Sequence, residues 1–223
     1  MELAKEIFVY VVKVKDHMQT GTTGNMKGVL TMSREVRQMR TASTEFFAKR
    51  DDTTEKLSIE GYFAVFNSNY DMGEGMSESI AEGAFDNTIS DDVRALINHD
   101  TTLVLGRTKA GTLQLRTDSH GLWGHIDINP NDTDAMNLYN RVQRGDVDQC
   151  SFGFDILNEE TDFREDGTVH WTIKEVKLYE VSPCTFPAYS ETSIAARAKE
   201  KSELMKRRND AWRDNMLARM KGE

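Results

Sequence analysis

The sequence predicts a β-rich α+β domain that closes part of the way into a barrel. Most of the chain consists of short runs of β-branched and aromatic residues separated by turn residues, which is typical of many short strands. A few helical segments lie between these runs, and the sequence has no internal repeat. At 223 residues the chain is long enough for one domain with a sizeable core and short terminal extensions.

We divide the chain into three parts. Residues 1–33 form an N-terminal extension of unknown role, in which a strand-like run is followed by a Gly/Thr-rich loop. Residues 34–196 form the main domain, and residues 197–223 form a basic helical tail. The tail carries apolar side chains along an otherwise charged helix, which is predicted to run from 193 to 220.

The main domain is predicted to contain most of the strands. They are expected at residues 46–49, 57–66, 93–97, 103–108, 111–117, 121–129, 150–156 and 169–181. The runs 103–108 and 111–117 are separated by Ala110-Gly111, which predicts a hairpin. Residues 79–90 have helical character, and the acidic stretch 158–167 is expected to be a loop.

The clearest helix is expected at residues 132–144. Asp132 or Thr133 can cap its N-terminus, and Gly145 provides a C-terminal stop. Between them, apolar residues recur at helical spacing; they are Ala135, Leu138, Tyr139 and Val142.

Charge and cysteine content exclude several classes of protein. The net charge is −9, but the tail alone has nine Lys/Arg against five Asp/Glu, so the remaining 196 residues carry a net charge of −13. Such an acidic body does not favour nonspecific nucleic-acid binding. Only two cysteines are present, without a CxxC pair, which argues against a zinc module or a disulfide-stapled secreted fold. The apolar run at 7–12 is too short to span a membrane, so we expect a cytoplasmic protein.

The stretch 150–156 is the best place for a nucleophile. Read with a period of two, Cys150 shares an apolar face with the two phenylalanines and the isoleucine that follow, whereas Ser151 and Gly153 share the other face. Because Gly153 has no side chain, a substrate backbone could approach closely there. Ser151 is not part of a Gly-x-Ser-x-Gly elbow and needs a base for activation. Cys150 is the adjacent rival, but its parity predicts that it points into the core.

His99 is the candidate base, since it follows the apolar strand 93–97 almost at once. The alternative is a surface or packing histidine. Glu180 shares the inward face of the late strand with two apolar residues, and a buried carboxylate there needs a partner such as a histidine. The alternative is a strand-end glutamate that reaches water. A metal site could use His99 and Asp100 with Asp127 or His125, but the spacing matches no known ligand motif, so we predict neither metal nor cofactor.

The order and spacing of several motifs between residues 59 and 197 resemble a known family. The motifs are IEGYFAVFN at 59–67, EGAF at 82–85, NHD at 98–100, LGR at 105–107, GL at 121–122, SFGF at 151–154, LYEVS at 178–182 and FPAY at 186–189. Together they resemble the prohead, or capsid maturation, serine proteases of HK97-like tailed phages, which are related to the herpesvirus assemblins.

The resemblance implies a β-barrel surrounded by helices and a serine endopeptidase that works inside the immature capsid, in the host cytoplasm. Its substrates would be the scaffolding protein or the scaffolding segment of the major capsid protein, and usually the enzyme itself. Those proteins are then the expected partners, together with possible self-association, and neither a membrane nor a specific nucleic acid is expected. The tail after Arg197 is a candidate for self-removal or for docking on scaffold.

Carried over by motif, His99 is the base and Ser151 the nucleophile. The herpesvirus enzymes use a second histidine as the third member. Here only His170 follows Ser151 at a comparable distance, and it lies at the start of its strand, so we prefer Glu180. Backbone N–H groups near 186–189 are a candidate oxyanion hole. The alternative function is a non-catalytic assembly protein of the same fold. The presence of both His99 and Ser151 favours the enzyme, because a binding module needs neither.

Overall fold

In the part of the chain that the structure describes, the strands form two sheets, and two helices accompany them. This computed structural model describes residues 34–42, 46–53, 55–164, 166–186 and 191–221, so the extension at 1–33 lies outside the described residues. The strands are β1 (Arg34–Ala42), β2 (Phe46–Arg50), β3 (Leu57–Val65), β4 (Tyr70–Gly73), β5 (Met76–Ile80), β6 (Arg94–Ile97), β7 (Asp100–Arg107), β8 (Leu113–Thr117), β9 (Gly121–Ile128), β10 (Gln149–Phe163) and β11 (Val169–Cys184). The helices are α1 (Thr133–Arg144) and α2 (Glu191–Lys221), with a short 3₁₀ turn at Thr108–Ala110.

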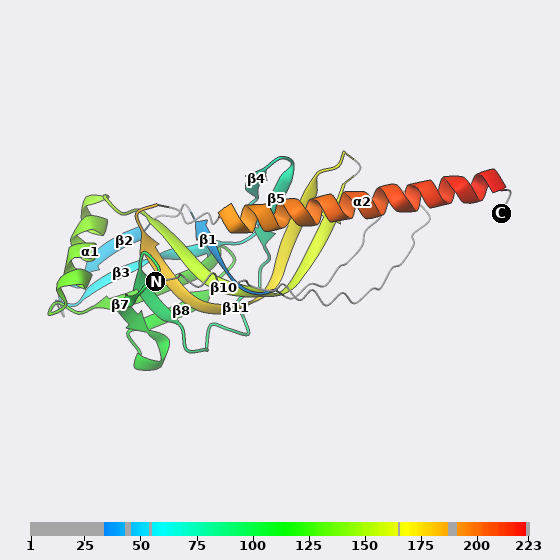
Figure 1. The fold of residues 1–223 in the computed structure, drawn as a ribbon. Coiled ribbons are helices and arrows are strands. Elements are labelled where there is room, and N and C mark those ends of the chain that lie inside the picture. Colours follow the sequence, from blue (N-terminus) through cyan, green and yellow to red (C-terminus); the bar gives the residue numbers. More distant parts are fainter. Residues whose placement is uncertain (1–33, 43–45, 54, 165, 187–190, 222–223) are drawn as a thin grey trace, which may run out of the picture.

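The larger sheet is organised around the long antiparallel hairpin of β10 and β11. Its seven strands follow the order β1-β10-β11-β5-β4, with β6 joined to β11 and β7 joined to β6. Both β5 and β6 run parallel to β11, at opposite ends of that strand. Figure 1 shows the curved hairpin reaching from the body of the molecule to the region beside α2. One hairpin therefore links two distant regions.

The smaller sheet is antiparallel, in the order β2-β3-β9-β8. Buried side chains from both sheets and from α1 form one core. In it, Phe152 of β10 contacts Phe85 edge-on, with ring centroids 5.6 Å apart, and stacks on Phe154 at 4.9 Å. These aromatic contacts hold the apolar face of β10 rigidly against the core.

Helix α1 confirms the sequence prediction. The Asp132 carboxylate accepts hydrogen bonds from the backbone N–H groups of Asp134 and Ala135, which is an N-cap. Gly145 follows the last turn with φ of 79°, a left-handed conformation that glycine adopts without steric cost. The four residues at helical spacing are all buried; they are Ala135, Leu138, Tyr139 and Val142.

Helix α2 packs on the body through the turns up to Arg208, whose guanidinium lies over the Phe163 ring. Ile194, Ala198 and Leu204 pack against a second apolar cluster, which consists of Met72, Met76, Val169 and Trp171. Beyond these turns the helix projects away from the body (Figure 1), and its Trp212 side chain is 66% exposed. No helix within the described residues is long and apolar enough to cross a membrane.

The β-rich α+β class is confirmed, but three local predictions are wrong. Residues 82–90 form turns rather than a helix, because most of their backbone hydrogen bonds reach back three residues instead of four. Strands β7 and β8 do not form a hairpin, since β7 pairs with β6 and β8 pairs with β9. The acidic loop expected at 158–167 is instead largely strand, because β10 continues to Phe163 opposite β11.

Candidate active site

The β10–β11 ladder brings two of the three predicted site residues onto one face. Ser151 lies opposite Ser182, and Gly153 lies opposite Glu180. Residues directly opposite each other in an antiparallel pair point to the same side of the sheet. Ser151, Ser182 and Glu180 are therefore neighbours on one face of the hairpin.

His99 reaches this face from the turn between β6 and β7. Ile97 pairs with Asp100, so Asn98 and His99 form a two-residue hairpin turn. Their φ angles are 50° and 63°, which places both residues in the left-handed region. This conformation costs roughly 1–2 kcal/mol for a residue with a Cβ, and glycine is the residue usually preferred at the second position of such a turn. Strain of this kind at a polar residue is a signal of function.

The turn is fastened to the C-terminal end of β11. The Asn98 backbone N–H donates to the Pro183 carbonyl at 3.1 Å, and the Thr185 N–H donates to the Asn98 side-chain oxygen at 2.9 Å. Because β6 also pairs in parallel with β11 at Glu180 and Val181, the turn has a fixed position relative to the carboxylate.

His99 and Glu180 form a short hydrogen-bonded pair. The ring Nδ1 lies 2.7 Å from the Glu180 Oε1, and the Ser182 hydroxyl donates to the other carboxylate oxygen at 2.7 Å. The same hydroxyl oxygen accepts the His99 backbone N–H at 3.3 Å. With Nδ1 donating to the carboxylate, Nε2 is the acceptor nitrogen of the neutral ring. Nε2 is buried and has no hydrogen-bond partner among the described residues.

Gly153 makes room for this carboxylate. A Cβ at this position would lie 2.4 Å from the Glu180 Oε1, which is closer than two non-bonded atoms can approach. The expectation that a substrate backbone approaches at Gly153 is therefore wrong, because the side chain of Glu180 occupies that space. Glycine serves here to admit the Glu180 carboxylate to the sheet face.

Ser151 is fully buried in this structure, with 0% exposure. Its hydroxyl donates to the backbone carbonyl of Arg40 at 2.8 Å. Arg40 belongs to β1, which runs antiparallel to β10 and places Thr41 opposite Ser151. The structure thus brings His99 and Glu180 into direct contact, whereas the hydroxyl of Ser151 is bonded to β1.

Neither cysteine competes as a nucleophile. Cys150 is buried as predicted, and its Sγ donates to the Tyr62 carbonyl at 3.0 Å. Burial, assisted by the Glu180 carboxylate, raises the pKa of Cys184 to about 11. That thiol is therefore protonated at neutral pH and is a poor nucleophile.

The remaining candidates lie elsewhere. The ring of His125 contacts Glu60 and Asp127, each at 3.0 Å, and the ring of His170 contacts Ser77 and Ser79. The described residues contain no group of three or more His, Cys, Asp and Glu side chains that could hold a metal ion. In the segment expected to supply the oxyanion hole, residues 187–189 lie outside the described residues.

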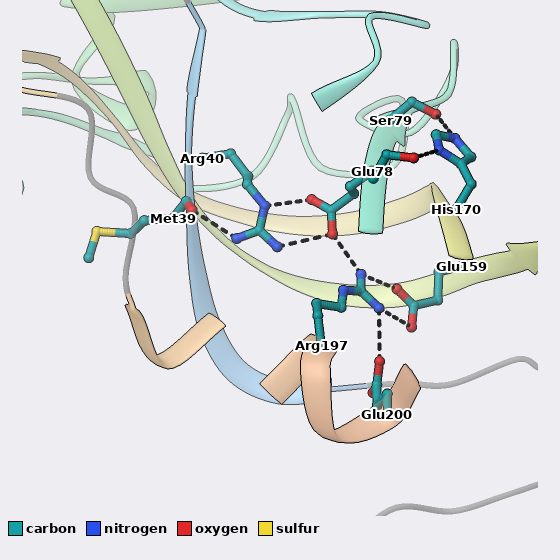
Figure 2. Close-up of polar contacts among 9 residues, drawn as sticks. Met39, Arg40, Glu78, Ser79, Glu159, His170, Arg197 and Glu200 are labelled. Carbon is teal, nitrogen blue, oxygen red and sulfur yellow. Dashed lines mark hydrogen bonds and ion pairs between the residues drawn. The ribbon is translucent and has the colours of Figure 1, made fainter. Parts of the chain in front are cut away.

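Sequence reasoning missed a second buried polar cluster, which we call the ionic cluster and define as Arg40, Glu78, Glu159, Arg197 and Glu200. In Figure 2, Arg40 donates hydrogen bonds from Nε and Nη2 to the two carboxylate oxygens of Glu78. Arg197 donates to both Glu78 and Glu159 and so joins them. The Arg197 Nη2 lies 2.7 Å from an oxygen of each of these carboxylates, and its Nη1 reaches Glu200 at 3.2 Å. The cluster joins β1, β5, β10 and α2.

Electrostatics keep the central carboxylate of this cluster ionised. Burial alone would raise the pKa of Glu78, but the adjacent guanidinium groups of Arg40 and Arg197 outweigh it and lower the pKa to about 2. Alternation could have revealed Glu78, because it lies between Met76 and Ile80 on the buried face of β5.

Residues 44–208 match the family model of the caudovirus prohead serine proteases. The chain belongs to this family. The match begins after β1 and includes His99, Ser151 and Glu180. The resemblance described from the motifs is therefore confirmed.

Two individual proteins are similar to this family member. The prohead protease of Enterobacteria phage HK97 is 30% identical over 142 residues, which cover 62% of this chain and 59% of the relative's length. The chain thus spans less than two thirds of that relative. The solved capsid assembly protease of bacteriophage T4 matches with a TM-score of 0.40 and 9% identity, covering 67% of this chain and 99% of the other.

Proposed function

We propose that this chain is a serine endopeptidase of phage prohead maturation. Its substrates are the scaffolding protein or the scaffolding segment of the major capsid protein, and the enzyme itself. The observation that carries the proposal is the 2.7 Å pair of His99 and Glu180 on the sheet face that also carries Ser151. Family membership supports the same reaction.

In the proposed mechanism Ser151 is the nucleophile, His99 the general base and Glu180 the group that orients the ring. The Ser151 hydroxyl turns from the Arg40 carbonyl towards the His99 Nε2 and attacks the scissile carbonyl carbon, while Nε2 takes the hydroxyl proton. The protonated ring then gives that proton to the leaving amine, and water hydrolyses the acyl-enzyme. Glu180 stabilises the charged ring because its carboxylate already holds Nδ1.

We place this activity inside the prohead, with the two capsid proteins as partners and with self-association as a further property. In the proposed domain organisation residues 34–196 are the protease domain and 197–223 the tail. The buried position of Arg197 supports a tail whose base is anchored on the domain. The exposed later part of α2 supports docking on scaffold or self-removal of the tail.

Co-expression with the phage's own capsid and scaffolding proteins tests the proposal. Wild type should produce defined fragments, whereas Ser151→Ala and His99→Ala should produce almost none, because each removes a group that the acyl transfer needs. Ser90→Ala and His120→Ala, at exposed positions, are matched controls and should cleave as wild type does.

The alternative outcomes are distinct. Fragments that persist with Ser151→Ala but vanish with His99→Ala would point to another nucleophile or to metal-dependent hydrolysis. Normal capsid assembly without cleavage, in wild type as well as in the variants, would favour the non-catalytic assembly protein.

A further inference from the structure

The first observation is the position of β1. This strand covers the edge of β10 in the sheet order β1-β10-β11, so β10 would be an edge strand without it. β1 lies before residues 44–208, which match the family model. It nevertheless pairs with β10 over the stretch that contains Ser151. A strand edge that is left uncovered can bind an extended peptide through backbone hydrogen bonds.

The second observation concerns access to Ser151. A substrate must place its scissile carbonyl at the Ser151 hydroxyl, but that hydroxyl is fully buried and is bonded to the backbone of β1. The strand beside the hydroxyl therefore stands where a substrate strand has to lie. In the present register Thr41 is opposite Ser151, and Arg40 is opposite Phe152.

The third observation is that the Arg40 side chain is held by specific contacts with buried side chains of two other strands. Its Nε and Nη2 donate to the two oxygens of Glu78, whose side chain is 2% exposed. The Arg40 guanidinium also lies over the Phe154 ring, 5.7 Å from the centroid. A planar fork on a carboxylate and a stacked aromatic face are the two contacts that distinguish arginine from lysine.

From these observations we propose that the edge of β10 binds the peptide substrate as an antiparallel strand, and that Glu78 and Phe154 form a subsite for an arginine of that peptide. In this structure β1 occupies the substrate's place and Arg40 fills the subsite. The inference rests on the proposed function, and it assigns to that function a substrate class: extended segments with arginine next to the residue opposite Ser151.

Electrostatics give the subsite its preference for a cation. If Arg40 leaves, Glu78 retains Arg197 among its described contacts, and Arg197 is shared with Glu159. A buried carboxylate with too little compensation is unfavourable, so the vacated subsite strongly favours an incoming guanidinium. A neutral side chain at the same position would leave the Glu78 carboxylate undercompensated.

Peptide binding to the full chain tests the subsite without requiring cleavage. The protein is the double variant Ser151→Ala, Arg40→Gln, in which a peptide stays intact and the native occupant of the subsite is weakened. The probes are fluorescein-labelled peptides of residues 34–43 with arginine, lysine or glutamine at position 40, measured by anisotropy. The arginine peptide should bind at least ~10-fold more tightly than the glutamine peptide, with lysine between them.

Two further variants locate the preference. Adding Glu78→Gln to the double variant should abolish the difference between the arginine and glutamine peptides. Adding Glu160→Gln, which removes an exposed carboxylate of β10 next to the cluster, should leave the difference intact. If Arg40→Gln prevents folding, Ser151→Ala alone serves, because the peptides then compete with β1 and the same order of affinity is expected.

The outcomes separate this inference from the proposed function. Equal binding of the three peptides, or binding of none, would overturn the subsite. Arginine preference in a chain whose active form cuts no capsid or scaffolding protein would overturn the proposed function and leave the subsite standing. Cleavage of those proteins without any preference for arginine would do the opposite.

Discussion

Two buried polar clusters each include residues of the β10–β11 hairpin, and their chemistry differs. The site cluster (His99, Glu180 and Ser182) contains one carboxylate held by a histidine ring and a hydroxyl. The ionic cluster pairs its buried carboxylates with guanidinium groups that are always charged. A cluster whose cation can gain and lose a proton is suited to catalysis, whereas a cluster of permanent charges is suited to holding elements together.

The clusters also differ in how they are assembled. The residues of the site cluster come from one strand and from a turn fastened to its end. The ionic cluster joins residues as far apart in the chain as Glu78 and Arg197, which are 119 positions apart. We therefore expect substitutions in the ionic cluster to act mainly on stability and substitutions in the site cluster to act mainly on rate.

The largest stability effect is expected for Arg197→Met. It leaves the buried carboxylates of Glu78 and Glu159 without their shared cation, which should lower the free energy of unfolding by about 3–5 kcal/mol. Urea denaturation followed by circular dichroism measures this. Arg213→Met, at an exposed position of the same helix, is the control and should change stability by no more than about 0.5 kcal/mol. Similar small effects for both variants would show that the ionic cluster does not hold α2 to the body.

Acid should weaken the ionic cluster next. The pKa of Glu78 is about 2 in the folded protein against an ordinary value of 4.5, so the folded state binds the proton less readily than the unfolded state. Its contribution, on the order of 3 kcal/mol, is present above pH ~4.5 and is lost as the pH falls towards ~2. The difference in unfolding free energy between wild type and Glu78→Gln should therefore shrink over that range. A difference that stays constant from pH 5 to pH 2 would contradict the assignment.

The smallest effect is expected in the site cluster, from Ser182→Ala. The variant removes one donor to the Glu180 carboxylate and the acceptor of the His99 backbone N–H. Losing these contacts should cost about 1–2 kcal/mol of transition-state stabilisation, or roughly a 10-fold fall in kcat/KM. Ser79→Ala, which removes a hydroxyl bonded to His170, provides the matched control. An equal fall in rate for both variants would show that the effect is not specific to the site cluster.

Much of the fold was predictable because its signals are local. The cap at Asp132, the apolar spacing of α1 and the glycine at its end are close together in the sequence and act within one helix. The alternation of 150–156 predicted that Cys150 points into the core, since side chains of a strand alternate whatever the strand pairs with. The same parity argument left Glu180 as either an inward carboxylate in need of a partner or a strand-end residue that reaches water, and the structure shows it buried and paired with His99.

What was missed depends on contacts between distant segments. The acidic stretch 158–167 is polar enough to predict a loop, but Glu159 is buried because Arg197 reaches it from α2. No local sequence pattern predicts that β7 pairs with β6 and that β8 pairs with β9. The space above Gly153 was predictable from its missing side chain, but its occupant, the carboxylate of Glu180, was not.

The sequence by itself determined the strand-rich class, the first helix and the buried face of β10, and its resemblance to a family supplied the residues that we propose as catalytic. Side-chain parity and capping are properties of neighbouring residues, so they survive without knowledge of the partner strands. Only the tertiary structure decided that His99 occupies a strained turn against Glu180 and that β1 covers Ser151. Only it revealed that Arg40, Glu78 and Arg197 meet, because strand register and helix docking bring together residues that the chain keeps far apart.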